Sequence, residues 1–261
     1  MPGDGVASAS LCADAYLLEL AGPGRIAALS WQAGDPISQA PGWARDLPRA
    51  WSDAERIYAL APAMTVFGAG EGGRTARLLD RAGLHRFELA WADDFDGVRV
   101  NLRALGEVLG EPERAAAAIR NLDARLAALD ARARQRGVRP HVLYLSASGG
   151  TAGAHTYVDA AIAAAGGTNA MAQAGVSGWP RARPEAVLGV EADLLVTSFF
   201  TDGYASTFNR GRHHAAYRHV LDATPRVEIP AGDWPCAGPR LIEAAERIAD
   251  ALDALPQEEA P

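Results

Sequence analysis

Short apolar runs bounded by turn residues recur along the chain, and stretches with helical spacing separate most of them. Runs of this length are typical of buried β-strands. The predicted strands are residues 26–29, 65–67, 87–89, 142–145, 194–197 and 227–229. Because strands and helices alternate, the pattern predicts an α/β fold with mainly parallel sheets that are covered on both faces.

Residues 112–136 interrupt this alternation. Alanine, leucine and arginine recur there at helical spacing, Pro112 suits a first helical turn, and Gly137 suits the stop. At about 1.5 Å per residue, such a helix would span roughly 36 Å, the scale of a small domain. We therefore predict two lobes, residues 1–110 and 138–261, joined by a single long helix over residues 111–137. An ordinary surface crossover helix is the alternative.

The segments on either side of this helix carry similar sequences. In each, a tryptophan is followed by turn residues, a glutamate at a helix start and a buried strand. Trp51 and Glu55 come before the first of these strands, and Trp179 and Glu185 come before the second. Such an internal repeat predicts two lobes of like construction. The alternative is that any two units of helix and strand resemble each other to this extent.

Both glutamates have an ordinary structural explanation. Ser52 and Glu55 match a capping box, in which serine and glutamate satisfy free amides at a helix start. Pro184 and Glu185 suit another first helical turn. Capping does not exclude a second role, because a carboxylate at the equivalent place of each lobe could also pair with arginines of a partner.

Composition and charge narrow the classes of function. The chain has 261 residues, of which 49% are hydrophobic and 22% charged, as in globular proteins. Its net charge of -7 makes nucleic acid an unfavourable partner. No apolar run approaches the roughly 20 residues needed to cross a bilayer, and the first ten residues lack the features of a signal peptide. We expect a soluble, monomeric chain from which a signal peptide is absent.

The motifs of catalysis and metal binding are weak. The loop from Gly68 to Gly73 formally matches the dinucleotide fingerprint GxGxxG, so an NAD(P)-dependent oxidoreductase is the alternative from another class. A tight turn is the simpler interpretation. No GxSxG elbow is present, and two cysteines 224 positions apart fit no metal-ligand spacing. A hydrolase is therefore disfavoured, and we expect no metal or cofactor of the protein's own.

Four tryptophans give a more specific signal, since each lies just beyond a predicted strand or just before a helix start. They are Trp31, Trp51, Trp179 and Trp234. Aromatic side chains in loops favour a wide cleft for a large flat ligand, and packing of lobe edges is the alternative. A polar stretch at residues 201–219, which includes Tyr204 and His213, suits a loop that contacts the ligand or supplies an axial ligand to a bound metal chelate.

Taken together, these segments resemble the class III, helical-backbone substrate-binding proteins of ABC importers. The resemblance extends from residue 11 to about residue 255 and rests on residues 25–36, 51–66, 151–169, 179–196 and 233–252. Members of this family carry cobalamin, ferric siderophores or haem, and the cobalamin-binding members look most similar. The resemblance implies a periplasmic protein without catalytic activity. Such a protein clasps a bulky ligand, most simply a corrinoid, between two lobes and delivers it to a permease and its ATPase. Ferric siderophores and haem remain alternatives.

The resemblance also assigns roles to residues. It implies that Glu55 and Glu185 dock onto arginines of the permease. It places Cys12 and Cys236 in loops of opposite lobes, where they are either a disulfide or two separate thiols. Tryptophans and an acidic residue are implied to line the ligand site, and we add three residues of neighbouring loops. The expected ligand contacts are Trp31, Trp51, Trp179, Asp233, Trp234, Tyr204 and His213.

Overall fold

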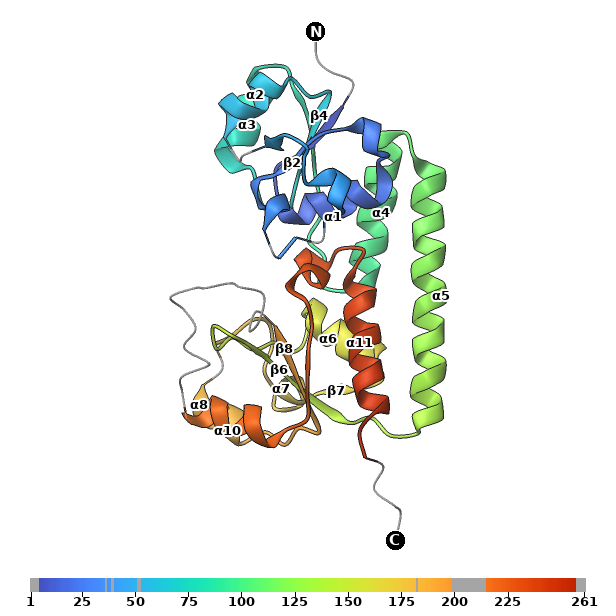
Figure 1. Cartoon of the computed structure of the whole chain (residues 1–261), viewed down its shortest axis with the longest axis vertical. Coiled ribbons are helices and arrows are strands. Elements are labelled where there is room, and N and C mark those ends of the chain that lie inside the picture. Colours follow the sequence, from blue (N-terminus) through green and yellow to red (C-terminus); the bar gives the residue numbers. More distant parts are fainter. Residues whose placement is uncertain are drawn as a thin grey trace. The chain divides into compact units, whose positions relative to one another are not determined.

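The computed structural model describes residues 5–35, 37–38, 40–50, 53–181, 183–198 and 215–256. The chain divides into two compact units. The first unit comprises Met1–Leu122 and Pro235–Arg240, and the second comprises Asp123–Trp234 and Leu241–Pro261. The division falls within α5 (Pro112–Arg136), the long green helix in Figure 1, which confirms the helix predicted there. The partition predicted from the sequence treats this helix as a separate part and stays a prediction.

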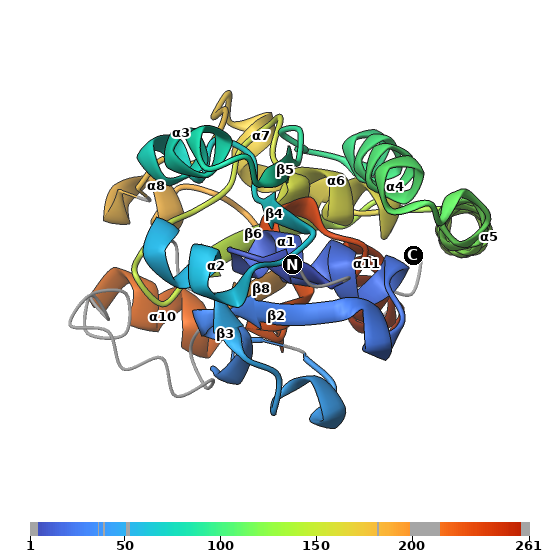
Figure 2. The ribbon, with the colours of Figure 1, turned by 90° about the horizontal axis from the view of Figure 1, so that it is seen from above.

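The first unit is built on a five-stranded parallel sheet with the order β3-β2-β1-β4-β5, of which Figure 2 shows β2 to β5. The strands are β1 (Val6–Ser8), β2 (Ile26–Ser30), β3 (Arg49–Ala50), β4 (Met64–Phe67) and β5 (His85–Glu88). The predicted strands at residues 26–29 and 65–67 are confirmed, and the one predicted at 87–89 lies slightly earlier. The two- and three-residue strands β3 and β1 are too short to give a hydrophobic pattern of their own.

Helices pack against this sheet in two groups. The helices of the first unit are α1 (Leu11–Leu20), α2 (Ala54–Leu60), α3 (Gly73–Arg81) and α4 (Phe95–Leu109). Its 3-10 turns are Pro23–Arg25, Trp31–Gly34, Gly42–Ala44 and Pro235–Ala237. One core cluster joins Ile57 of α2 and Leu79 of α3 to Phe67 and to alanines of the sheet. Helix α1 contacts β1, β2 and β4, and it also packs against α4. The unit is therefore a layered α/β structure, as predicted.

The second unit has a four-stranded parallel sheet with the order β7-β6-β8-β9. The strands are β6 (His141–Ser146), β7 (Thr168–Asn169), β8 (Leu194–Ser198) and β9 (Arg226–Glu228). The strands predicted at residues 142–145 and 194–197 are confirmed, and the one predicted at 227–229 begins one residue earlier. The helices are α6 (Tyr157–Ala164), α7 (Ala170–Gln173), α8 (Pro184–Leu188), α10 (Ala215–Ala223) and α11 (Leu241–Asp253), with a 3-10 turn at Ala231–Asp233.

Within the second unit, the C-terminal half of α5 is joined to α11 by ion pairs. The Arg125 guanidinium binds Glu246, with Nε 2.7 Å from Oε1. One turn or more further along, Arg132 and Arg136 both bind Asp253. Burial raises the pKa of Asp253, but hydrogen bonds from the two arginines outweigh burial and hold that pKa below its ordinary value. None of the helices in the described ranges is long and apolar enough to cross a membrane.

Candidate functional site

Each sheet has one place where its topology favours ligand binding. In an open parallel sheet, ligands bind beyond the carboxyl ends of the strands, where successive connections leave in opposite directions. In the first unit this point lies between β1 and β4, because β2 and β3 follow on one side and β5 on the other. In the second unit it lies between β6 and β8. The side chains that follow these four strands are therefore the first candidates for a site.

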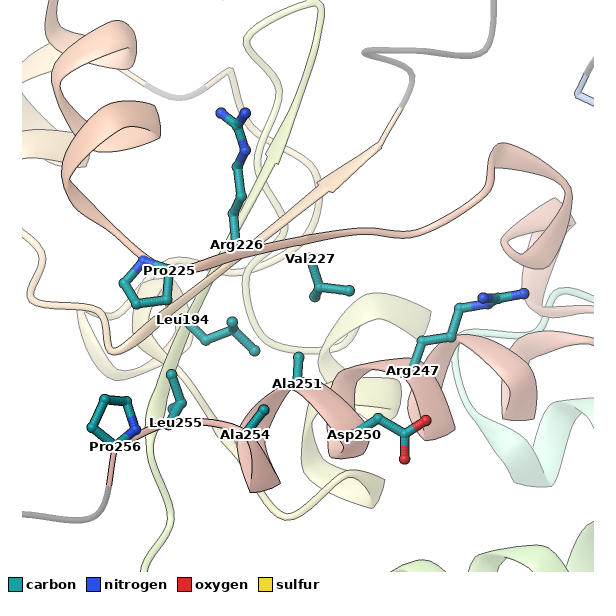
Figure 3. A pocket seen from close by; sticks show the side chains of 10 residues that line it. All are labelled: Leu194, Pro225, Arg226, Val227, Arg247, Asp250, Ala251, Ala254, Leu255 and Pro256. Carbon is teal, nitrogen blue, oxygen red and sulfur yellow. The ribbon is translucent and has the colours of Figure 1, made fainter.

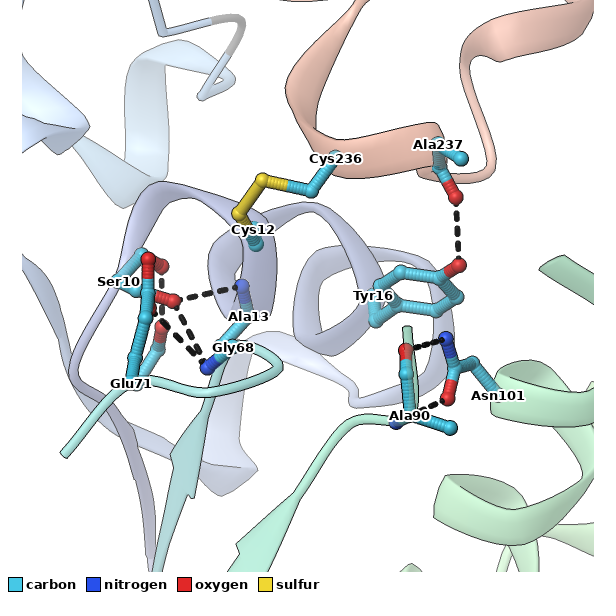
Figure 4. Close-up of a disulfide and its surroundings, with 11 residues drawn as sticks. Ser10, Cys12, Ala13, Tyr16, Gly68, Glu71, Ala90, Asn101, Cys236 and Ala237 are labelled. Carbon is cyan, nitrogen blue, oxygen red and sulfur yellow. Dashed lines mark hydrogen bonds between the residues drawn. A yellow bond between two sulfur atoms is a disulfide. The ribbon is translucent and has the colours of Figure 1, made fainter. Parts of the chain in front are cut away.

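In the first unit, the loop from Gly68 to Gly73 follows β4 and its amides are already occupied by the chain's own side chains. The amide of Gly68 donates to Ser10 Oγ at 3.1 Å and to a carboxylate oxygen of Glu71 at 3.2 Å, as Figure 4 shows. Gly70 donates to Oε1 of Glu88 at 3.0 Å. A bound pyrophosphate would meet two carboxylates at the amides that a dinucleotide site leaves free for it. The geometry therefore gives no support to the nucleotide-binding alternative.

Glycine in this loop has a steric reason instead. Gly72 has a φ of +88°, and a Cβ there would lie 2.8 Å from Cδ1 of Phe67, so any other residue would clash with a core ring. Gly70, with a φ of +69°, is covered by the indole of Trp91 at 3.0 Å from the position of a Cβ. The fingerprint is thus explained by tight packing at a turn.

Two tryptophans of the first unit expose their rings near the carboxyl ends of its strands. Trp31 begins the 3-10 turn after β2 and is 44% exposed. Trp91 follows β5 by three residues and is 78% exposed, which makes it the most exposed large apolar side chain among the described residues. Sequence reasoning missed Trp91, although the rule that selected the other tryptophans, a position just beyond a predicted strand, applies to it equally.

The two cysteines are joined within the first unit, so the expectation that they lie in loops of opposite lobes is wrong. Cys12 in α1 forms a disulfide with Cys236, with 5.4 Å between the Cα atoms (Figure 4). Beside it, Tyr16 donates a hydrogen bond of 2.7 Å to the carbonyl of Ala237, and burial raises the pKa of Tyr16 well above its ordinary value. Both bonds hold the short segment from Pro235 to Arg240, whose neighbours in sequence belong to the second unit, against α1 of the first unit.

In the second unit, four aromatic side chains gather at the carboxyl-end side of β6 and β8, one of them from within β6. We call Tyr144, Tyr157, Trp179 and Trp234 the aromatic group. The rings of Tyr157 and Trp179 are tilted with centroids 4.7 Å apart, and the ring of Tyr144 meets both tryptophans edge-on, at 6.4 Å and 5.9 Å. Tyr157 also lies 6.1 Å from Trp234. Packed rings of this kind form a stiff apolar surface.

Burial divides the aromatic group into a base and one presented ring. Tyr144 and Trp234 are 5% and 3% exposed and Tyr157 is partly buried, whereas Trp179 is 47% exposed. The indole N–H of Trp234 donates to Ser198 Oγ, and burial raises the pKa of Tyr144, which therefore stays a neutral phenol. Trp179 is thus the most exposed ring of the aromatic group and the first candidate for stacking on a ligand. A direct ligand contact by Trp234 stays a prediction.

Asp233, another expected ligand contact, is fully buried and bound to Arg247, with 3.0 Å between Oδ2 and Nε. Its expected contact with the ligand stays a prediction. The same arginine borders a pocket of about 450 Å³, which Figure 3 shows between α11 and the amino-terminal ends of β8 and β9. None of the four rings of the aromatic group lines this pocket, which is therefore separate from it.

The two glutamates expected to dock are both exposed at the starts of helices. Glu55 lies in the first turn of α2 and Glu185 in that of α8. The predicted capping box is wrong, because α2 begins one residue later than expected and Asp53 is the cap, accepting from the amide of Arg56 at 2.9 Å. Neither glutamate forms an ion pair or hydrogen bond with another described residue, and their docking role stays a prediction.

Some expected residues cannot be placed. Trp51, Tyr204 and His213 lie outside the described residues. Within the described ranges, no cluster of three or more histidine, cysteine, aspartate or glutamate side chains is arranged to hold a metal ion.

Comparison with known proteins identifies a family and solved structures of similar fold. The family described as "Periplasmic binding protein" matches residues 49–204, more than half of the chain. A cobalamin-binding protein of Halobacterium salinarum, strain R1, is 29% identical over 213 residues, which are 77% of this chain and 56% of that protein. The chain therefore spans little more than half the length of this curated relative.

Two solved structures illustrate the similarity of fold. The periplasmic heme-binding protein RhuT from Roseiflexus sp. RS-1, in apo form, has a TM-score of 0.77 at 23% identity, covering 95% of this chain and 98% of that one. The periplasmic vitamin B12 binding protein BtuF of Vibrio cholerae has a TM-score of 0.70 at 20% identity, covering 97% of both chains. At these identities the similarity shows the fold alone.

Proposed function

The chain belongs to the periplasmic binding protein family, and from that premise we propose that it captures a corrinoid and delivers it to an ABC importer. The relative with 29% identity, a cobalamin-binding protein, supports this choice of ligand. We also propose that the chain acts by binding alone, without catalysis.

The observation that carries the proposal is the aromatic group of the second unit. A corrin ring is broad and largely apolar on its faces, so it is recognised best by a flat apolar surface. Trp179 offers such a surface, because about half of it is exposed while the rings beneath hold it in place. A rigid aromatic contact loses little conformational entropy when the ligand binds, which favours affinity.

Haem and ferric siderophores are the competing ligands. Both are large and in part flat, and a presented indole would stack on either. The solved haem-binding structure is only 23% identical to this chain, which is too low to indicate the ligand. The 29% identity to a cobalamin-binding protein favours the corrinoid.

The remaining parts of the proposal concern place and partners. We propose that the protein works outside the cytoplasmic membrane, and the disulfide between Cys12 and Cys236 supports this, since disulfides persist in oxidising compartments. We also propose that Glu55 and Glu185 dock onto basic side chains of the permease, with an ATPase driving transport. Their exposed carboxylates, which form no ion pair with another described residue, suit charge-assisted contacts.

A thermal-shift panel tests the choice of ligand. Cyanocobalamin, haemin, a ferric siderophore and NAD are each added to the purified chain, and the ligand that binds the folded state stabilises it by mass action, about 2.7 kcal/mol at a concentration 100 times the dissociation constant. We expect the largest shift with cyanocobalamin. A shift with NAD alone would overturn the proposal and restore the oxidoreductase alternative.

A further inference from the structure

Two short helices, one in each unit, share an arrangement of three side chains. In α2, Glu55 is exposed, Ile57 is fully buried in the core, and Tyr58 is 61% exposed. Residues three positions apart lie on the same side of a helix, so Glu55 and Tyr58 are neighbours on its outer surface. The buried isoleucine fixes this surface to the unit.

The second helix repeats the arrangement at the same spacing. In α8, Glu185 is exposed, Val187 is fully buried, and Leu188 is 53% exposed. The two helices also occupy equivalent places in their sheets. Each leads into the strand just across the point where the connections reverse, α2 into β4 and α8 into β8.

The exposed apolar side chains are the unexplained part of this arrangement. Single exposed apolar residues are common and need no explanation. Here, however, a large one stands three residues after an exposed glutamate on both equivalent helices, although the sequences of the helices otherwise differ. Covering such a side chain with a partner would be favourable, because apolar surface is removed from water.

We propose that Tyr58 and Leu188 are apolar anchors for docking onto the permease, each paired with the neighbouring glutamate. The inference rests on the proposed function, since it takes the transmembrane permease of an ABC importer as the partner. It specifies what the permease must present to each unit: a basic side chain for the carboxylate and an apolar depression beside it for the ring or the leucine.

The chemistry explains why the two kinds of contact belong together. An ion pair between a carboxylate and a guanidinium in open water contributes little binding free energy, because water screens the two charges and solvates each of them favourably. An apolar contact at their side excludes water and strengthens the ion pair, as contacts around interface hot spots do. Tyr58 and Leu188 each lie three residues after the glutamate on the same side of a helix, so they are placed to shield Glu55 and Glu185 in this way.

Biolayer interferometry tests the proposal. It measures how tightly the purified chain, in the presence of cyanocobalamin, binds the permease–ATPase complex of the same organism in lipid nanodiscs. The key variant is Tyr58→Ala with Leu188→Ala. The matched control is Val100→Ala with Val138→Ala, which removes side chains 50% and 63% exposed, one from each unit and neither beside the glutamates. Circular dichroism confirms that every variant is folded.

We expect the Tyr58 and Leu188 variant to bind the complex at least tenfold more weakly, and the control to bind like the wild type. A third variant, Glu55→Gln with Glu185→Gln, separates the inference from its premise. If that variant lost binding while the Tyr58 and Leu188 variant bound normally, docking by carboxylates would stand and the anchors would be wrong. If the wild type itself did not bind, the proposed function and the anchors would both fall.

Discussion

Replacing Trp179 by alanine should weaken ligand binding strongly and stability moderately, and the structure gives both magnitudes. A fully buried tryptophan removes roughly 200 Å² from water. Since Trp179 is 47% exposed, about half of that area is buried already. At about 25 cal/mol per Å², its loss should cost folding roughly 2.5 kcal/mol, an upper estimate because denatured chains bury some surface themselves.

The exposed half of the ring sets the effect on the ligand. Covering roughly 100 Å² would yield up to about 2.5 kcal/mol, and stacking adds about 1 kcal/mol, but binding never realises such sums in full. We therefore expect the variant to lose about 1.5–3 kcal/mol of binding free energy, which is about 10- to 150-fold in the dissociation constant for cyanocobalamin.

Calorimetric titration at a temperature where both proteins are folded measures this change. The control is Trp43→Ala, which removes a tryptophan 43% exposed in the first unit and should cost similar stability without changing the affinity. If Trp179→Ala bound cyanocobalamin as tightly as the wild type while its melting temperature fell, Trp179 would be a packing residue and the role of the aromatic group would be refuted.

Three other changes have defined outcomes. Glu55→Gln with Glu185→Gln should change stability by less than about 1 kcal/mol and leave ligand affinity unaltered, yet abolish uptake into vesicles that contain the permease; normal uptake would limit both residues to helix starts. Cys12→Ser with Cys236→Ser should lower the free energy of unfolding by about 2–5 kcal/mol in calorimetry, and two reactive thiols in the denatured, unreduced wild type would contradict the bridge. Asp253→Asn should cost under about 1 kcal/mol at pH 7, because the carboxylate is 39% exposed. Its lowered pKa makes this contribution present above about pH 4 and lost as the pH falls through that lowered pKa, so the stabilities of variant and wild type in urea titrations should converge at acid pH.

The elements that could be predicted from the sequence are those with a strong periodic signal. Helix α5 was readable from end to end, since proline marks its start and glycine its stop. Strands buried on both faces, such as β8, appear as continuous apolar runs. The strand β1 escaped notice because three residues carry no period, although it is the central strand of its sheet.

The candidate site was predictable only in part. Trp179 stood out because it lies among turn residues, but nothing in the sequence showed that Tyr144 and Tyr157 support it. Both tyrosines lie within regular elements, where an aromatic residue normally indicates core packing. Asp14 gave no signal either: it is buried in α1, where Ser30 donates to it from both its amide and its hydroxyl. Such contacts depend on tertiary structure, which local patterns do not encode.

Binding of a corrinoid by the purified chain can be measured in a single titration. Purified protein is titrated with cyanocobalamin in an isothermal calorimeter, with haemin and NAD titrated in parallel. We expect saturable binding of one cyanocobalamin per chain with a dissociation constant of about 1 µM or tighter, and weaker or no binding of haemin and NAD. No heat of binding with cyanocobalamin, together with saturable binding of haemin or NAD, would contradict it.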